Sequence, residues 1–84
     1  PSKYAVVLHN DDYTPMDFVV FVLQEVFNHP FERAERIMLS VHTEGVGVAG
    51  IYHFEIAEQK AYDSADLAKE HQYPLKITIE EIHS

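Results

Sequence analysis

The sequence predicts an α+β fold, a single small domain over residues 1–84 in which three helices cover one face of a three-stranded antiparallel sheet. Three observations lead to this prediction. The chain has only 84 residues and contains no repeat, low-complexity tract or Gly/Ser linker, which favours one unit. Short apolar runs typical of strands are interspersed with segments whose apolar residues recur at helical spacing. The resulting order of elements is β-α-α-β-α-β.

The chain opens with a predicted strand and a predicted helix start. The apolar run Tyr4–Leu8 stops at the turn-forming residues Asn10–Asp12, as a buried strand does where it enters a loop. Thr14 is expected to cap the helix that follows, because Pro15 suits the first helical position and Asp17 completes a capping box three residues after Thr14.

The first helix is expected over about 15–27, where apolar residues cover more than one stripe and are mostly core. A second helix is expected over about 31–43, with Gly45 as its C-terminal cap. The β-branched and aromatic segment 46–54 predicts a strand that bends or packs closely at Gly47 and Gly50.

The C-terminal part predicts a further helix and a final strand. Residues 55–71 carry a face of small side chains at helical spacing, which lets a helix pack closely on its neighbour. After Pro74, apolar and polar residues alternate with the period of a half-buried strand. The apolar members of that alternation are Leu75, Ile77 and Ile79.

Composition excludes several classes of function. With 6 Lys plus Arg against 14 Asp plus Glu, the formal charge is −8, so the chain lacks the basic surface that nucleic acids require. No apolar run is long enough to span a membrane, and no signal peptide is visible. The absence of Cys excludes thiolate chemistry and is compatible with the cytoplasm. We therefore expect a cytoplasmic protein that binds neither nucleic acid nor membrane.

The polar run Asn10–Asp12 has two readings. Asn and Asp are common turn residues, so the run can serve only to connect a strand to a helix. However, a pair of carboxylates and an amide carbonyl also provide the acceptors that a cationic amine needs. The spacing of a calcium-binding loop is not present.

His42, near the end of the second predicted helix, also has two readings. It either interacts with the exposed carbonyl groups of the helix end or offers a neutral imidazole as an acceptor beside an apolar pocket. The six histidines show no spacing typical of a metal site, and no nucleophile motif or phosphate-binding glycine loop occurs. We therefore expect a protein without a metal, a cofactor or catalytic activity.

Several blocks of the chain resemble the ClpS family of adaptor proteins. These blocks are Asn10–Val19, Arg36–His42, Gly45–Gly47, Tyr52–Lys60 and His71–Leu75. The resemblance implies a bacterial or organellar adaptor that binds substrate proteins through destabilising N-terminal residues (Leu, Phe, Tyr, Trp). Such an adaptor hands these substrates to a AAA+ unfoldase of the ClpA or ClpC type, through the N-domain of the unfoldase, for degradation.

The resemblance also implies where the binding residues lie. The site for the α-amino group of the substrate falls on Asn10, Asp11, Asp12 and His42. The pocket for the N-terminal side chain is expected to be lined by Leu8, Thr14, Met16, Val19, Met38, Val41 and Leu75. The surface that faces the unfoldase is expected to include Glu55 and Lys60.

The sequence departs from the family at His9, where an aliphatic residue usually precedes the Asn, so we expect an imidazole close to the pocket. Residues 1–84 do not include the family's flexible N-terminal extension, which the resemblance associates with delivery to the unfoldase. We therefore expect substrate recognition, rather than delivery, to survive in these residues. Two alternatives stay open: a small α+β domain that binds a metal or another ligand through its His and Asp residues, and an interaction domain in which Asn10–Asp12 is only a turn.

Overall fold

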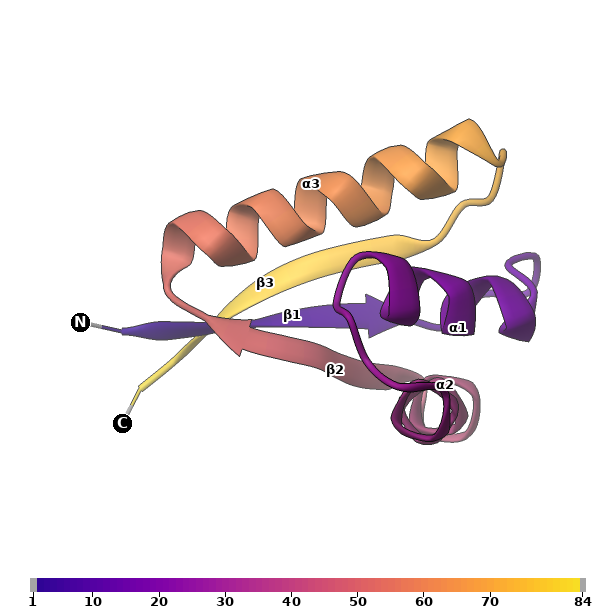
Figure 1. Ribbon diagram of the computed structural model, residues 1–84, viewed down its shortest axis with the longest axis horizontal. Helices are drawn as coiled ribbons and strands as arrows, with labels where there is room; N and C mark the ends of the chain where they lie inside the picture. The colour runs from indigo at the N-terminus through magenta and orange to yellow at the C-terminus, as the bar shows by residue number, and fades with distance from the viewer. Residues whose placement is uncertain (1, 84) are drawn as a thin grey trace.

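The computed structural model describes residues 2–83 and has the predicted order of elements around an antiparallel sheet (Figure 1). Pro1 and Ser84, the ends of the predicted domain, lie outside the described residues. The elements are β1 (Lys3–His9), α1 (Met16–Glu25), α2 (Phe31–Glu44), β2 (Val46–Tyr52), α3 (Phe54–Glu70) and β3 (Lys76–Ile82).

The strands are arranged in the order β2-β1-β3, with β1 antiparallel to both neighbours. Val6 pairs with Gly50 and Val7 pairs with Val48, so Ala49 is an extra residue that bulges from the β1–β2 ladder. The carbonyl oxygen of Ala49 accepts a hydrogen bond of 2.5 Å from His29 Nε2. The loop between α1 and α2 is therefore attached to the bulge of β2.

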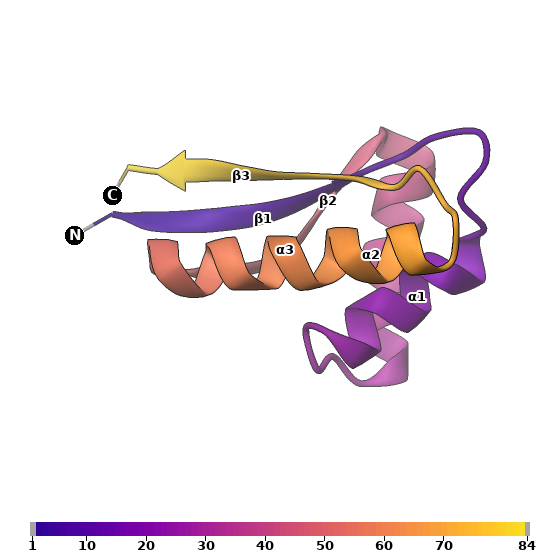
Figure 2. The same ribbon diagram turned by 90° about the horizontal axis from the view of Figure 1, so that it is seen from above.

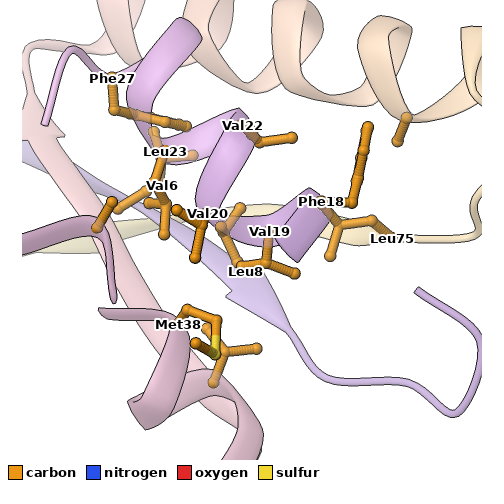
Figure 3. Close-up of a cluster of buried hydrophobic side chains, with 14 of the residues drawn as sticks. Val6, Leu8, Phe18, Val19, Val20, Val22, Leu23, Phe27, Met38 and Leu75 are labelled. Carbon is orange, nitrogen blue, oxygen red and sulfur yellow. The ribbon is translucent and has the colours of Figure 1, made fainter. Parts of the chain in front are cut away.

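The core lies between the helices and one face of the sheet. Val6 and Leu8 alternate on that face of β1 and are fully buried. In Figure 2 the α3 helix runs along the sheet, while α1 and α2 group together at one end of the molecule. Figure 3 shows the side chains that α1 contributes around this face. They include Phe18, Val19, Val20, Val22 and Leu23.

Gly47 allows α2 to pack closely on β2. A Cβ atom at this position would lie 2.7 Å from the Val41 side chain and 3.1 Å from the carbonyl oxygen of Ile37. Both contacts come from α2, so any larger residue at Gly47 would push this helix away from the sheet. The predicted close packing at Gly47 is confirmed, and it fixes the C-terminal half of α2 against β2.

The predicted small face of α3 is also confirmed. Ala57, Ser64 and Ala68 are buried and Ala61 is half-buried, while the Ser64 hydroxyl donates a 2.8 Å hydrogen bond to the carbonyl oxygen of Lys60. The helix ends where Gln72 adopts a left-handed conformation (φ 63). Aromatic contacts then join this end to α1. The centroid of the Phe18 ring lies 5.2 Å from that of His71 and 4.7 Å from that of Tyr73.

Two details of the predicted elements are wrong. No side chain caps α1, because the Thr14 hydroxyl donates instead to the Asp11 carboxylate, so the predicted capping box with Asp17 does not form. The strand predicted over 46–54 ends at Tyr52, because α3 already begins at Phe54. The Phe54 ring packs edge-on against Tyr4 of β1, with 5.1 Å between ring centroids.

Candidate functional site

The loop that follows β1 is joined to the C-terminal end of α2. The backbone N–H of Asn10 donates a 2.9 Å hydrogen bond to the carbonyl oxygen of Gly45. Gly45 itself closes α2 in the left-handed conformation (φ 91), as predicted, and its N–H bonds to the Val41 carbonyl oxygen. Since His42 lies in the last turn of α2, this bond brings together the loop and the helix end that carries His42.

Asp11 organises the loop. One carboxylate oxygen accepts hydrogen bonds from the backbone N–H groups of Tyr13 (2.8 Å) and Thr14 (2.7 Å), and the other accepts a 2.7 Å bond from the Thr14 hydroxyl. Burial would raise the pKa of the Asp11 carboxyl, but these hydrogen bonds together lower it below its ordinary value. The hydrogen bonds therefore favour the ionised form of Asp11, and the carboxylate fixes the conformation of the loop.

The other polar residues of the predicted amine site are solvent-accessible. Asn10, Asp12 and His42 are all exposed, and residues 9–16 include no Lys or Arg. The negative end of the α2 dipole lies beside the same loop, so carboxylates and helix carbonyl groups act in the same direction. The arrangement attracts a cation that has several hydrogen-bond donors.

The residues predicted to form the side-chain pocket are mostly in the core. Figure 3 shows Leu8, Val19, Met38 and Leu75 within the buried cluster, to which Val41 also belongs. The two remaining residues lie nearer the surface: Thr14 is half-buried and Met16 is 48% exposed. The predicted pocket residues therefore divide into a buried apolar base and two residues nearer the surface, which directly follow the acidic loop in the chain.

A groove of about 700 Å³ lies between α1 and α2. Met16 and Met38 line it, so it adjoins the predicted pocket, but the rest of its lining was not predicted as part of a site. Phe21, one of the apolar residues of the helix that the sequence predicts to be mostly core, is 38% exposed in this groove, and Phe31 is 52% exposed. Large apolar residues on the polar side of each helix are the sequence signal that identifies this groove.

The side chain of His9 does not lie close to the predicted pocket, where the resemblance to the family led us to expect it. Its Nε2 atom is 2.7 Å from the Thr78 hydroxyl of β3, so the ring is directed along the sheet towards β3. Because side chains alternate along β1, His9 faces away from the side on which Leu8 is buried. The expected imidazole at the wall of the pocket is replaced by a hydrogen bond on the open face of the sheet.

Glu55 and Lys60, both predicted at a partner surface, lie on α3 but not on one face of it. Glu55 is exposed and lines a shallow hollow with Glu58, Gln59 and Tyr62. The Lys60 ammonium instead donates a 2.7 Å hydrogen bond to the carbonyl oxygen of Val26, just after α1. Five residues along a helix correspond to a rotation of about 140°, which accounts for the separation.

No three His, Cys, Asp or Glu side chains within residues 2–83 gather around a point that a metal ion can occupy. None of the helices there combines the length and the apolar character needed to cross a membrane. The cation-attracting loop and the apolar residues beside it make up the candidate site.

The chain is similar in sequence to known Clp protease adaptors. A family model described as "ATP-dependent Clp protease adaptor protein ClpS" matches residues 1–78. The ATP-dependent Clp protease adapter proteins ClpS of Phenylobacterium zucineum and Caulobacter vibrioides (strain NA1000 / CB15N) are each 55% identical to it over 80 residues. Each comparison covers 95% of this chain and 73% of the relative.

The fold is also similar to that of a solved ligand complex. The structure of Agrobacterium tumefaciens ClpS2 bound to L-phenylalaninamide superimposes with a TM-score of 0.94 and is 41% identical in sequence. The superposition covers 98% of this chain and 99% of the other. The likeness therefore includes every element of the fold and the loop between β1 and α1.

The hydrogen bonds of Asp11 predict a pH-dependent contribution to stability. We expect Asp11→Asn to lower the free energy of unfolding by about 1 to 2 kcal/mol near pH 7, because Asn cannot accept from the Thr14 hydroxyl with its amide nitrogen. Since the pKa of Asp11 is lowered in the folded state, its stabilisation is complete above about pH 4 and is lost as the pH falls through the folded value.

Urea unfolding of both proteins across this pH range measures the effect. The difference in unfolding free energy between them should shrink in acid. Asp12→Asn is the matched control, because the Asp12 side chain is exposed and accepts no hydrogen bond from residues 2–83. This substitution should lower the free energy of unfolding by less than about 0.5 kcal/mol. Equal costs for the two substitutions would show that Asp11 does not organise the loop.

Proposed function

The chain belongs to the ClpS family of ATP-dependent Clp protease adaptors, which are not enzymes, and we propose that it binds substrate proteins by their N-terminal residue. The preferred residues are large and unbranched at Cβ: Leu, Phe, Tyr and Trp. The adaptor then delivers the substrate to the AAA+ unfoldase of the protease. The observation that carries the proposal is the Asn10 to Gly45 hydrogen bond, which sets the acidic loop against the end of α2.

A free N-terminus suits this loop for chemical reasons. The α-amino group is an ammonium with three hydrogen-bond donors and a positive charge, whereas an internal peptide bond has one donor and no charge. Asn10, Asp12 and His42 are exposed acceptors, and Asp11 adds a negative charge while its oxygens hold the loop. We propose that the first three contact the ammonium and that Asp11 both positions them and contributes to the field.

The side chain of the substrate's first residue is proposed to enter beside Met16, towards the apolar base formed by the buried pocket residues. Burying a Leu or Phe side chain contributes about 1.5 to 3 kcal/mol, which is comparable to the contribution of the ammonium contacts. Met16 and Met38 have flexible thioethers that adapt to both rings and branched chains. The amine site and this pocket together select a residue that has both a free α-amino group and a large apolar side chain.

The ligand of the similar structure supports this proposal. L-phenylalaninamide, which is bound to Agrobacterium tumefaciens ClpS2, has a free α-amino group and a Phe side chain, with an amide in place of the next peptide bond. It has the chemistry of an N-terminal Phe residue. We propose that this chain binds the same group through the loop after β1.

The delivery partner is proposed to be the N-domain of an unfoldase of the ClpA or ClpC type. Because such an unfoldase needs ATP, we propose that it acts together with the adaptor in the cytoplasm. Glu55 and Lys60 are proposed to face this partner. Glu55 is the residue better suited to a test, because it is exposed and its side chain forms no hydrogen bond with other residues in the range 2–83. Lys60 also bonds to Val26, so its replacement would change the protein as well as the surface.

Blocking the α-amino group of a peptide is expected to abolish most of its binding. An acetyl group removes the charge and leaves the acceptors of the loop desolvated without a donor, so affinity for a Phe-initiated peptide should fall at least about tenfold. Fluorescence anisotropy with matched free and acetylated peptides measures this. The proposal does not survive if the two peptides bind equally well.

Shortening Met16 is expected to change which side chains are accepted. Met16 begins α1 after Pro15, so its backbone has little freedom to withdraw. Ile and Val carry a branch at Cβ that would meet Met16 at the rim of the pocket. Met16→Ala should raise the affinity for Ile-initiated peptides relative to Leu-initiated ones by about tenfold. If this ratio does not change, the limit on shape lies elsewhere in the pocket.

Reversing the charge of Glu55 is expected to weaken the capture of the adaptor by the unfoldase N-domain. Since Glu55 lies on α3, away in sequence from the loop after β1, Glu55→Arg should leave affinity for a Phe-initiated peptide unchanged. Surface plasmon resonance with each partner in turn separates the two effects. A parallel loss of peptide binding would mean that the two surfaces are not independent.

A further inference from the structure

The face of the sheet that looks away from α1 and α3 is apolar along β2 (Figure 2). An antiparallel sheet with helices on one side normally presents polar side chains on the other. Val46, Val48 and Ile51 of β2 are instead 46%, 49% and 52% exposed, and none of the three belongs to the core cluster. Val48 and Ile51 pair with Val7 and Ala5 of β1, which also lie outside that cluster. We call the three exposed side chains of β2 the β2 row.

The strand on the other side of β1 follows the usual rule. Lys76 and Thr78 of β3 pair with His9 and Val7, so they lie on the same face as the β2 row. Lys76 is exposed, and the Thr78 hydroxyl is hydrogen-bonded to His9. The apolar surface is therefore a property of β2 itself and not of the whole open face.

Positive charges lie on both sides of the β2 row. Arg33 of α2 lines a hollow of about 400 Å³ together with Val48 and Ile51, and no Asp or Glu within residues 2–83 lines this hollow. Lys76 lies on the opposite side, across β1. Among the strand residues of the described range, Glu80 is the one carboxylate on this face. The surface is thus less acidic than a chain with a formal charge of −8 would lead one to expect.

The outer edge of β2 does not suit an added strand. β2 is an edge strand, because the sheet has the order β2-β1-β3. Its ladder is interrupted by the bulge at Ala49, and the carbonyl oxygen of Ala49 already accepts a hydrogen bond from His29. Bulges and covered backbone groups are devices that prevent edge pairing. A partner therefore has the side chains of the β2 row to contact rather than a free backbone edge.

The dimensions of the surface match a helix. The five steps from Val46 to Ile51 span about 16 Å, which corresponds to about 11 helical residues, or about three turns. β2 and β3 lie about 10 Å apart across β1, a distance close to the diameter of a helix with its side chains. A helix lying along the β2 row therefore has Arg33 on one flank and Lys76 on the other.

Charge decides between the helices of different proteins. A second copy of this chain would bring another charge of −8 and another row with cations on both sides, which opposes self-association. A helix with carboxylates on both flanks of an apolar stripe is complementary to the apolar side chains and to the cations at once.

We propose that the β2 row is the docking surface for an amphipathic helix of a partner protein, about three turns long, with Asp or Glu on both sides of its apolar stripe. The apolar side chains cover Val48 and Ile51, and the carboxylates pair with Arg33 and Lys76. This inference does not rest on the proposed function, because the β2 row contains none of the residues proposed to contact the substrate or the unfoldase.

Two fluorescent peptides of about 11 residues test the inference. Both have Leu at helical spacing and an acetylated N-terminus, which excludes them from the proposed amine site, and they differ only in having Glu or Lys beside the Leu stripe. By anisotropy, the Glu peptide should bind at least about fivefold more tightly than the Lys peptide. The net charge of −8 alone would favour the Lys peptide, so general attraction does not produce this order.

Two pairs of variants assign the binding to the β2 row. Ile51→Ser should weaken binding of the Glu peptide at least about fivefold. The matched control Ile56→Ser removes an Ile side chain of the same 52% exposure from α3 and should leave the affinity unchanged. Lys76→Glu should abolish the preference for the Glu peptide, whereas Lys69→Glu, the same charge change at an exposed position of α3, should not.

Amide chemical shifts of the 15N-labelled protein locate the Glu peptide, and we expect shifts concentrated at Val46–Ile51 and around Lys76. Shifts concentrated between α1 and α2, tighter binding of the Lys peptide, or equal effects of Ile51→Ser and Ile56→Ser would overturn the inference. Binding without a gain of helical circular dichroism would also overturn it. Sedimentation should show a monomer, and a dimer that Ile51→Ser dissociates would assign the β2 row to a second copy instead.

Discussion

A backbone hydrogen bond from the Asn10 N–H to the Gly45 carbonyl oxygen holds the loop after the central strand against the end of α2, and the candidate site depends on it. Gly45 provides this acceptor because it ends α2 in a left-handed conformation. Gly47, two residues later, lets α2 approach the sheet closely enough for the contact to form. The packing of one helix on one strand thereby places His42 beside an acidic loop.

The fold could be predicted from the sequence because the period of its apolar residues marks the helices and strands, and a glycine marks the end of α2. The order β-α-α-β-α-β and the glycine end of α2 both follow from local pattern. Thr14 was misread because its hydroxyl has two candidate partners, and only the folded loop shows that the Asp11 carboxylate takes it. Competition between a cap and an Asx-type turn depends on geometry that residue spacing does not contain.

The parts of the site that could not be predicted depend on which way side chains point. His9 bonds to Thr78, a contact between residues 69 positions apart, and Lys60 bonds to the carbonyl of Val26 on another element. The groove between α1 and α2 arises from two helices that each appear merely amphipathic in sequence. Phe21 lies in the helix whose apolar residues the sequence predicts to be mostly core, yet it is exposed, because a periodic pattern does not distinguish a residue that faces the core from one that faces a groove.

An adaptor of this kind needs no chemistry beyond recognition, and its charge and its apolar surface are arranged around one end of α2. Titration of the 15N-labelled protein with L-phenylalaninamide, followed by amide chemical shifts, tests this account most directly. It predicts shifts concentrated at Asn10–Thr14 and in the last turn of α2 around His42, and none with N-acetyl-L-phenylalaninamide. Shifts concentrated on α3 or on the open face of the sheet, or equal shifts with both compounds, would contradict it.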